Sequence, residues 1–103
     1  MNLTSLGSDA RIGYWRWYSN AAGGAPNADV FTVSVSNNNG TSWTNVETVG
    51  PTGAEVSGGW YYHEFRVADR VPVTAQVRLK FVAEDAATGS LIEAAIDDVT
   101  VFK

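Results

Sequence analysis

The sequence predicts an all-β domain, an antiparallel β-sandwich of about six strands, from two observations. Valine, threonine and aromatic residues dominate its apolar segments, and these residue types favour extended strands. Glycine, asparagine and proline gather between the apolar segments, where their backbone preferences favour turns. Short strands separated by turns at this spacing are typical of sandwiches and barrels.

The strand assignments rest on the alternation of apolar and polar side chains. The pattern is clearest at Phe31, Val33 and Val35, which alternate with threonine and serine and therefore share one face. The last segment is apolar on both faces, which is typical of a strand that is central in its sheet or covered on both sides. The predicted strands are 10–19, 30–36, 42–49, 60–67, 76–84 and 91–102, with a short extra strand at 3–6.

Length and composition predict a single domain over residues 3–102. The chain has 103 residues, of which 45% are hydrophobic, so it can bury one core. Its formal net charge of -4 argues against a nucleic-acid partner, because nucleic acids bind basic surfaces. No apolar run approaches the ~20 residues of a membrane helix, so no membrane partner is expected. The lack of cysteine excludes disulfides and thiolate metal sites.

One turn-forming segment resembles the Asp-box, a hairpin motif with the pattern Ser-x-Asp-x-Gly-x-Thr-Trp. In residues 36–43, Asn38 stands at the place of the aspartate and Ser42 at the place of the threonine. In such a turn a short polar side chain bonds to the backbone, Gly40 supplies a positive φ and Trp43 packs beneath. The resemblance implies a hairpin brace and not a catalytic element.

Two longer stretches resemble a jelly-roll module that is appended to secreted bacterial multidomain proteins. They are residues 10–20 and 93–99, and the second contains Ile-Asp-Asp-Val, which is similar to the last strand of MAM domains and of several carbohydrate-binding modules. The resemblance implies a jelly-roll sandwich in an extracellular parent protein. The family module has a further segment at its N-terminus, so this chain is expected to match its C-terminal part and to leave strand edges uncovered.

Asp97 and Asp98 are candidate metal ligands. As neighbours in a strand they are expected to point to opposite faces, so they cannot act as an acid–base pair on one substrate. The resemblance implies that an aspartate here can help to hold a structural calcium ion, which needs six to eight oxygen ligands. The alternative is a pair of edge carboxylates bonded to arginine, with no cofactor at all.

Four aromatic residues are the candidate ligand-binding residues. Trp15 and Trp17 share one face of their strand, and Trp60 and Tyr62 share one face of theirs. Sugars stack on exposed aromatic rings, so these residues predict a glycan or protein ligand if they lie outside. The alternative is that they pack in the core or against a neighbouring molecule.

The charged residues within the strands are expected to have structural and not catalytic roles. Arg16, Glu64, Arg78 and Glu93 are expected to form a ladder of ion pairs across one sheet face. The single histidine, His63, has no nucleophile context and is expected to be a surface or half-buried strand residue. The sequence therefore predicts that the protein is not an enzyme.

Three functions follow from these observations. The first is a non-catalytic accessory or adhesion module of a secreted multidomain protein. The second is a carbohydrate-binding module that uses the exposed aromatic residues. The third is a truncated, self-associating fragment with no function of its own, because strands apolar on both faces need cover. A homo-oligomer with Trp15 or Trp17 at the contact is the expected assembly.

Overall fold

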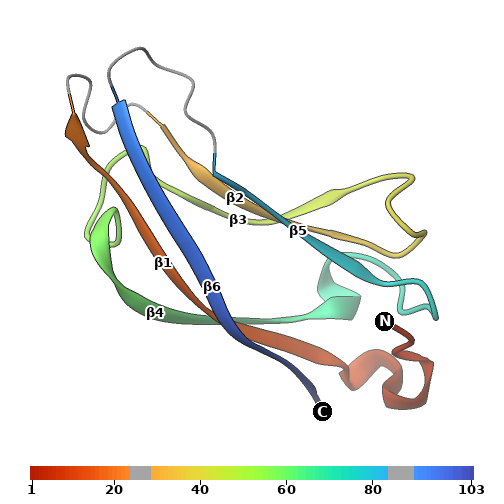
Figure 1. Ribbon diagram of the computed structural model, residues 1–103. Helices are drawn as coiled ribbons and strands as arrows, with labels where there is room; N and C mark the ends of the chain where they lie inside the picture. The colour runs from red at the N-terminus through yellow and green to blue at the C-terminus, as the bar shows by residue number, and fades with distance from the viewer. Residues whose placement is uncertain (24–28, 84–89) are drawn as a thin grey trace.

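Six strands form two antiparallel sheets that pack face to face (Figure 1). The computed structural model describes residues 1–23, 29–83 and 90–103. The strands are β1 (Arg11–Gly23), β2 (Phe31–Ser36), β3 (Thr44–Val49), β4 (Ser57–Arg66), β5 (Arg78–Ala83) and β6 (Ser90–Phe102). The predicted all-β sandwich is thus confirmed.

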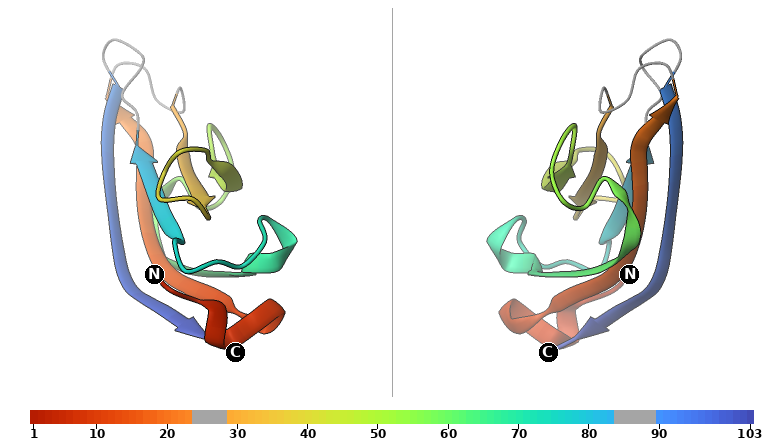
Figure 2. Two further views of the ribbon diagram at one scale, coloured as in Figure 1. Left: turned by 90° about the vertical axis from the view of Figure 1, so that its right-hand side faces the viewer. Right: turned by 90° about the vertical axis from the view of Figure 1, so that its left-hand side faces the viewer.

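The first sheet has the strand order β4-β1-β6 and the second has the order β3-β2-β5. Only β2 and β3 are consecutive strands in the same sheet, so every other connection passes from one sheet to the other. Figure 2 shows the sheets from the side, with the long strand β6 along the margin of the first sheet. The central strands, β1 and β2, provide the largest fully buried side chains, which are those of Tyr14, Tyr18 and Phe31.

The core lies between the inner faces of the two sheets. Tyr14 and Tyr18 of β1 are fully buried, as are Val33 and Val35 of β2, so the alternation expected from the sequence is confirmed in β2. The Tyr14 ring meets the Phe81 ring edge-on with centroids 5.2 Å apart. Each such side chain contributes about 1.5–3 kcal/mol by leaving water.

The extra strand expected at residues 3–6 is wrong, because a 3-10 helix, η1 (Thr4–Asp9), begins there. Leu3 is buried and Leu6 packs against the core. A 3-10 helix has three residues per turn, so it places both leucines on one side, whereas a strand would separate them. The second short helix is η2 (Val67–Asp69), and no helix among the described residues is long and apolar enough to cross a membrane.

The N-terminal residues run beside the segment that leads into β5. The Met1 amino group donates a hydrogen bond to the Val77 carbonyl at 2.6 Å, and the Val77 N–H donates to the Met1 carbonyl at 2.9 Å. The Leu3 N–H then donates to the Thr74 carbonyl at 3.1 Å. These bonds fix the start of the chain against the second sheet.

Two strands extend by several residues beyond their predicted bounds. β1 continues to Gly23, and β4 begins at Ser57 instead of Trp60. The pairing register between β1 and β4 shifts near Gly58, which has a φ of 89°. Glycine adopts this backbone conformation at little cost, so a bulge replaces the loop that the glycines suggest.

The turn between β2 and β3 is closed by side-chain hydrogen bonds. The Asn38 Oδ1 atom accepts bonds from the Ser36 hydroxyl at 2.7 Å and from the Ser42 N–H at 3.0 Å. The Asn38 Nδ2 atom donates to the Ser42 hydroxyl at 2.8 Å. Gly40 has a φ of 89°, and the half-buried Trp43 ring lies beside it.

β6 is an edge strand whose inner face is partly uncovered. Its register with β1 shifts between Asp97 and Thr100, and Asp98 has a φ of 50°. Beyond this bulge Val101 pairs with the buried Ile12 and therefore faces inward, yet it is 37% exposed, and Val99 is 46% exposed. The expectation that the last strand is central in its sheet or covered on both sides is therefore wrong, because β6 lies at the edge of the first sheet and the second sheet ends at β5.

We predict that Asn38→Ala lowers the free energy of unfolding by about 1–3 kcal/mol, because it leaves the turn donors and acceptors without partners. Asn38→Asp keeps the two accepted bonds and should lose less than half as much. Urea unfolding measures both values. Asn45→Ala is the control, since Asn45 makes only long, exposed bonds and should change stability by less than about 0.5 kcal/mol. Equal losses for the alanine and aspartate variants would contradict this role of Asn38.

Candidate functional site

Four aromatic side chains lie together on the outer face of the first sheet. Trp15 of β1 is directly opposite Tyr62 of β4, and Trp17 is directly opposite Trp60. Opposed residues in antiparallel strands lie on the same face, and this face is the one turned away from the buried Tyr14 and Tyr18. We call these four residues (Trp15, Trp17, Trp60 and Tyr62) the aromatic face. The structure thus brings together every aromatic residue that the sequence suggests as ligand-binding.

The aromatic face is open to solvent. Trp15 is 40% exposed, Trp60 is 49% exposed and Tyr62 is 44% exposed, while Trp17 is partly buried. The Trp15 and Tyr62 rings contact each other with centroids 5.4 Å apart. Large aromatic side chains bury readily, so three exposed rings on one sheet form an apolar patch that core packing does not explain.

Two glycines form the floor on which two of the rings lie, and neither is predicted from the sequence as a site residue. A Cβ atom on Gly13 would overlap the hydroxyl group of Tyr62, so the Tyr62 ring lies across β1 at this point. A Cβ atom on Gly58 would lie 2.9 Å from the Trp17 ring. A glycine placed opposite or diagonal to an aromatic residue is the signal that could have identified this arrangement.

Carboxylates surround the aromatic face. Asp97 of β6 pairs with Trp15, and Glu64 of β4 pairs with Gly13, so both share the outer face. Glu93 lines a shallow hollow of about 330 Å³ together with Trp17 and Trp60. The outer face of the first sheet therefore combines apolar rings with exposed negative charge.

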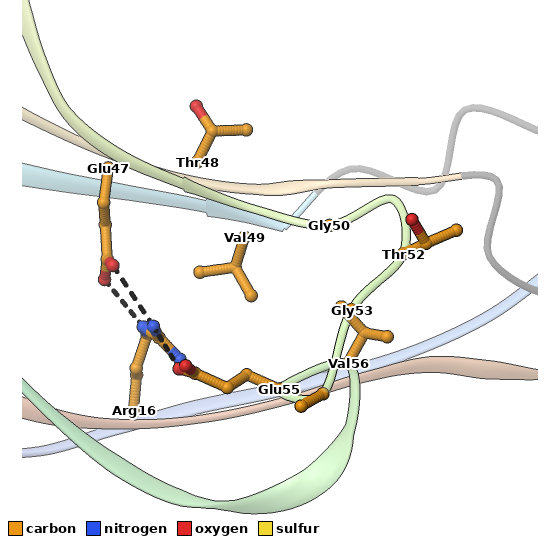
Figure 3. Close-up of a pocket in the computed structure, with 10 residues that line it drawn as sticks. Arg16, Glu47, Thr48, Val49, Gly50, Thr52, Gly53, Glu55 and Val56 are labelled. Atoms are coloured by element: carbon orange, nitrogen blue, oxygen red, sulfur yellow. Dashed lines mark hydrogen bonds and ion pairs between the residues drawn. The ribbon is translucent and has the colours of Figure 1, made fainter.

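A polar cluster lies on the opposite, inner side of the first sheet (Figure 3). Arg16 is 6% exposed, and its Nε and Nη2 atoms donate to the two carboxylate oxygens of Glu47 at 2.6 and 3.2 Å. The Nη2 atom also donates to Glu55 at 2.6 Å. The Tyr14 hydroxyl donates to the same Glu47 carboxylate at 2.7 Å. We call Tyr14, Arg16, Glu47 and Glu55 the polar cluster.

The polar cluster shifts the proton affinities of its members. Burial raises the pKa of Tyr14 well above its usual range, and its hydrogen bond to Glu47 raises that pKa further. Burial acts to lower the pKa of Arg16, but the hydrogen bonds to Glu47 and Glu55 outweigh it and the pKa is raised. Both groups therefore stay protonated in the folded protein. The cluster holds β1 to β3 and to the loop before β4, and its geometry is that of a structural ion pair.

The ladder of ion pairs expected at Arg16, Glu64, Arg78 and Glu93 is wrong. Arg16 faces inward and bonds to Glu47 and Glu55, whereas Glu64 and Glu93 lie on the outer face of the sheet. Arg78 belongs to β5 in the other sheet. The expectation fails because strand alternation places residues on faces, but the sequence does not reveal which strands are neighbours.

His63 is a half-buried strand residue, as predicted. It is opposite Tyr14, and the two rings lie 5.7 Å apart. Its Nδ1 atom lies 3.4 Å from the Glu47 carboxylate, so a protonated His63 would add to the charges that balance Glu47.

Asp97 and Asp98 lie at the bulge in β6, and both are exposed. The Asp98 N–H donates to the Asp97 carboxylate at 2.8 Å. Asp98 departs from extended backbone, so simple strand alternation does not fix the direction of its side chain. Within residues 1–23, 29–83 and 90–103, no third carboxylate or histidine completes a metal cluster at this position, and neither aspartate pairs with an arginine. The calcium ion implied by the resemblance stays a prediction.

No family model, curated protein or solved structure matches this chain. The resemblance to a jelly-roll accessory module and the extracellular location that it implies therefore stay predictions. The candidate site rests on the geometry of the aromatic face alone.

We predict that Tyr14→Phe changes both the stability and its pH dependence. Above pH ~10 the Tyr14 hydroxyl stays protonated in the folded protein but ionises in the unfolded chain. The stability that this hydroxyl contributes is therefore complete below pH ~10 and falls as the pH rises further. The variant should lose about 1.5–3 kcal/mol at neutral pH, as expected for a hydrogen bond to a charged group. Above about pH 10 its stability should approach that of the wild type.

Urea unfolding between neutral pH and about pH 11 measures this difference, and Tyr62→Phe is the control because the exposed Tyr62 ring lies outside the polar cluster. A constant difference between wild type and Tyr14→Phe over the whole range would contradict the assignment.

Proposed function

We propose that this chain is a non-catalytic module that binds a glycan on its aromatic face. The observation that carries the proposal is the set of three exposed rings, those of Trp15, Trp60 and Tyr62, on one side of a single sheet. A sheet holds such side chains at fixed positions, so the rings are arranged before any ligand arrives. Preorganised rings lose little conformational freedom on binding.

A sugar ring suits this surface for a chemical reason. The face of a pyranose carries C–H groups with slight positive charge, and the face of an aromatic ring is negative, so the two stack. The hydroxyl groups at the edge of the sugar remain free to bond with water or with the polar side chains around the rings. The rings form two opposed pairs, Trp15 with Tyr62 and Trp17 with Trp60, so the face offers more than one stacking position along a polymer.

Glycan binding accounts for the aromatic face better than a purely structural role does. A structural role leaves unexplained why three rings expose 40–49% of their surface. A second copy of this chain could cover the same rings, in keeping with the homo-oligomer expected from the sequence. The accessory role within a secreted parent protein, and the hairpin brace implied by the Asp-box resemblance, fit a binding module and are part of the proposal.

We predict that Trp60→Ala weakens binding to polysaccharides by about tenfold or more, which is ~1.4 kcal/mol of binding free energy. Affinity electrophoresis and pull-down with neutral, amine-bearing and acidic polysaccharides measure this loss. Gly13→Ala should also weaken binding, because the new methyl group displaces the Tyr62 ring from its place over β1. That variant alters the face without removing a ring.

The controls separate ligand binding from folding and from self-association. Val99→Ala truncates an exposed apolar side chain of β6 that is not part of the aromatic face, and should bind as the wild type does. Thermal unfolding checks that each variant is folded, and sedimentation checks that the binding species is the same size. Binding to none of the polysaccharides, or unchanged binding by Trp60→Ala, would overturn the proposal.

A further inference from the structure

The charged side chains on the outer face of the first sheet are arranged in an ordered way. Paired residues define five rows across β4, β1 and β6: Ser57–Ser19–Glu93, Trp60–Trp17–Ala95, Tyr62–Trp15–Asp97, Glu64–Gly13–Thr100 and Arg66–Arg11–Phe102. The four residues of the aromatic face occupy the second and third rows. All the charged residues in the first four rows are acidic, and the arginines are confined to the fifth.

These carboxylates are free of basic partners. Glu64, Glu93 and Asp97 are exposed, and within the described part of the chain none of them forms an ion pair with a lysine or arginine. Arg66, at the end of the sheet, is already bonded to Asp69 at 3.0 Å. Three exposed carboxylates therefore lie around the aromatic rings, and no lysine or arginine among the described residues pairs with them.

The hollow beside Trp60 places aromatic rings and a carboxylate next to each other. It is lined by the Trp17 and Trp60 rings and by Glu93. An aromatic face attracts a cation through its quadrupole, and a carboxylate attracts the same cation through its charge. Because neighbouring strands are about 4.8 Å apart, Asp97 offers the same combination beside Trp15 in the next row.

We infer that the glycan bound by this face is an amino-sugar polymer that carries protonated amines. This inference rests on the proposed glycan-binding function and adds the chemical class of the ligand. The sugar rings stack on the aromatic residues, and the ammonium groups lie against Glu93, Asp97 and Glu64. The same carboxylates repel polymers of uronic acids and sulfated sugars.

The test compares three oligosaccharides of equal length by calorimetry at a pH where the amines are protonated. They are the glucosamine hexamer, the N-acetylglucosamine hexamer, which has the same backbone without charge, and the cellulose hexamer. We expect the glucosamine hexamer to bind about tenfold more tightly than either neutral one at low salt, since several weak charge contacts add. The advantage should disappear in about 1 M salt, where the Debye length falls to about 3 Å.

Neutralising the carboxylates should remove the preference while leaving the stacking. The double variant Glu93→Gln/Asp97→Asn should bind all three hexamers with similar affinity and keep the binding of the neutral ones. Asp9→Asn is the matched control, because it removes one exposed negative charge outside the aromatic face and should keep the preference. Trp60→Ala should weaken binding of all three.

The outcomes separate the two proposals. Equal binding of the charged and neutral hexamers by the wild type, or an unchanged preference in the double variant, overturns the amino-sugar inference and leaves glycan binding standing. Binding to none of the three hexamers, together with no binding to longer polysaccharides, overturns both.

Discussion

The ion pair between Arg16 and Glu47 is the interaction on which the two faces of the first sheet depend. Arg16 sits in the middle of the central strand and is almost completely buried, so its charge requires a partner inside the sandwich. Glu47 provides two carboxylate contacts from the other sheet, and Tyr14 bonds to the same carboxylate. This connection fixes which side of β1 faces inward. Strand alternation then sends Trp15 and Trp17 outward.

The same constraint explains why the two polar groupings of this protein have different roles. Inside, the charges are paired at hydrogen-bond distance and hold the sheets together. Outside, the carboxylates of Glu64, Glu93 and Asp97 have no basic partner among the described residues and lie beside aromatic rings. Paired charges stabilise a fold, whereas exposed and unpaired charges around apolar rings are available to a ligand. The aromatic face therefore carries the binding proposal and the polar cluster does not.

The sequence predicts the features that depend on local alternation. The buried face of β2, the shared face of Trp15 and Trp17, and the half-buried position of His63 are all compatible with a period of two. Features that depend on which strands are neighbours cannot be predicted in this way. The partners of Arg16 lie 31 and 39 residues away along the chain, whereas the sequence pattern favours a ladder with residues that lie on the other face.

Single-residue departures from regular strand geometry also cannot be predicted from the local sequence pattern. The sequence predicts a loop at Gly58, but this residue forms a bulge within β4 and makes room for the Trp17 ring. The αL conformation of Asp98 interrupts β6 at a point where strict alternation is expected. The N-terminal segment forms a 3-10 helix instead of a strand, because only the helix lets both Leu3 and Leu6 pack against the core. In each case tertiary contacts decide between local alternatives.

The most direct test of the central claim uses the four tryptophans of the chain as reporters. Three of them belong to the aromatic face, and Trp43 lies on the hairpin of the other sheet, where the Lys80 ammonium is 4.6 Å from its ring. In a titration with the glucosamine hexamer, the indole N–H signals of Trp15, Trp17 and Trp60 should shift in NMR spectra while that of Trp43 stays in place. A shift of Trp43 alone, or equal shifts of all four signals, would contradict a binding site on the aromatic face.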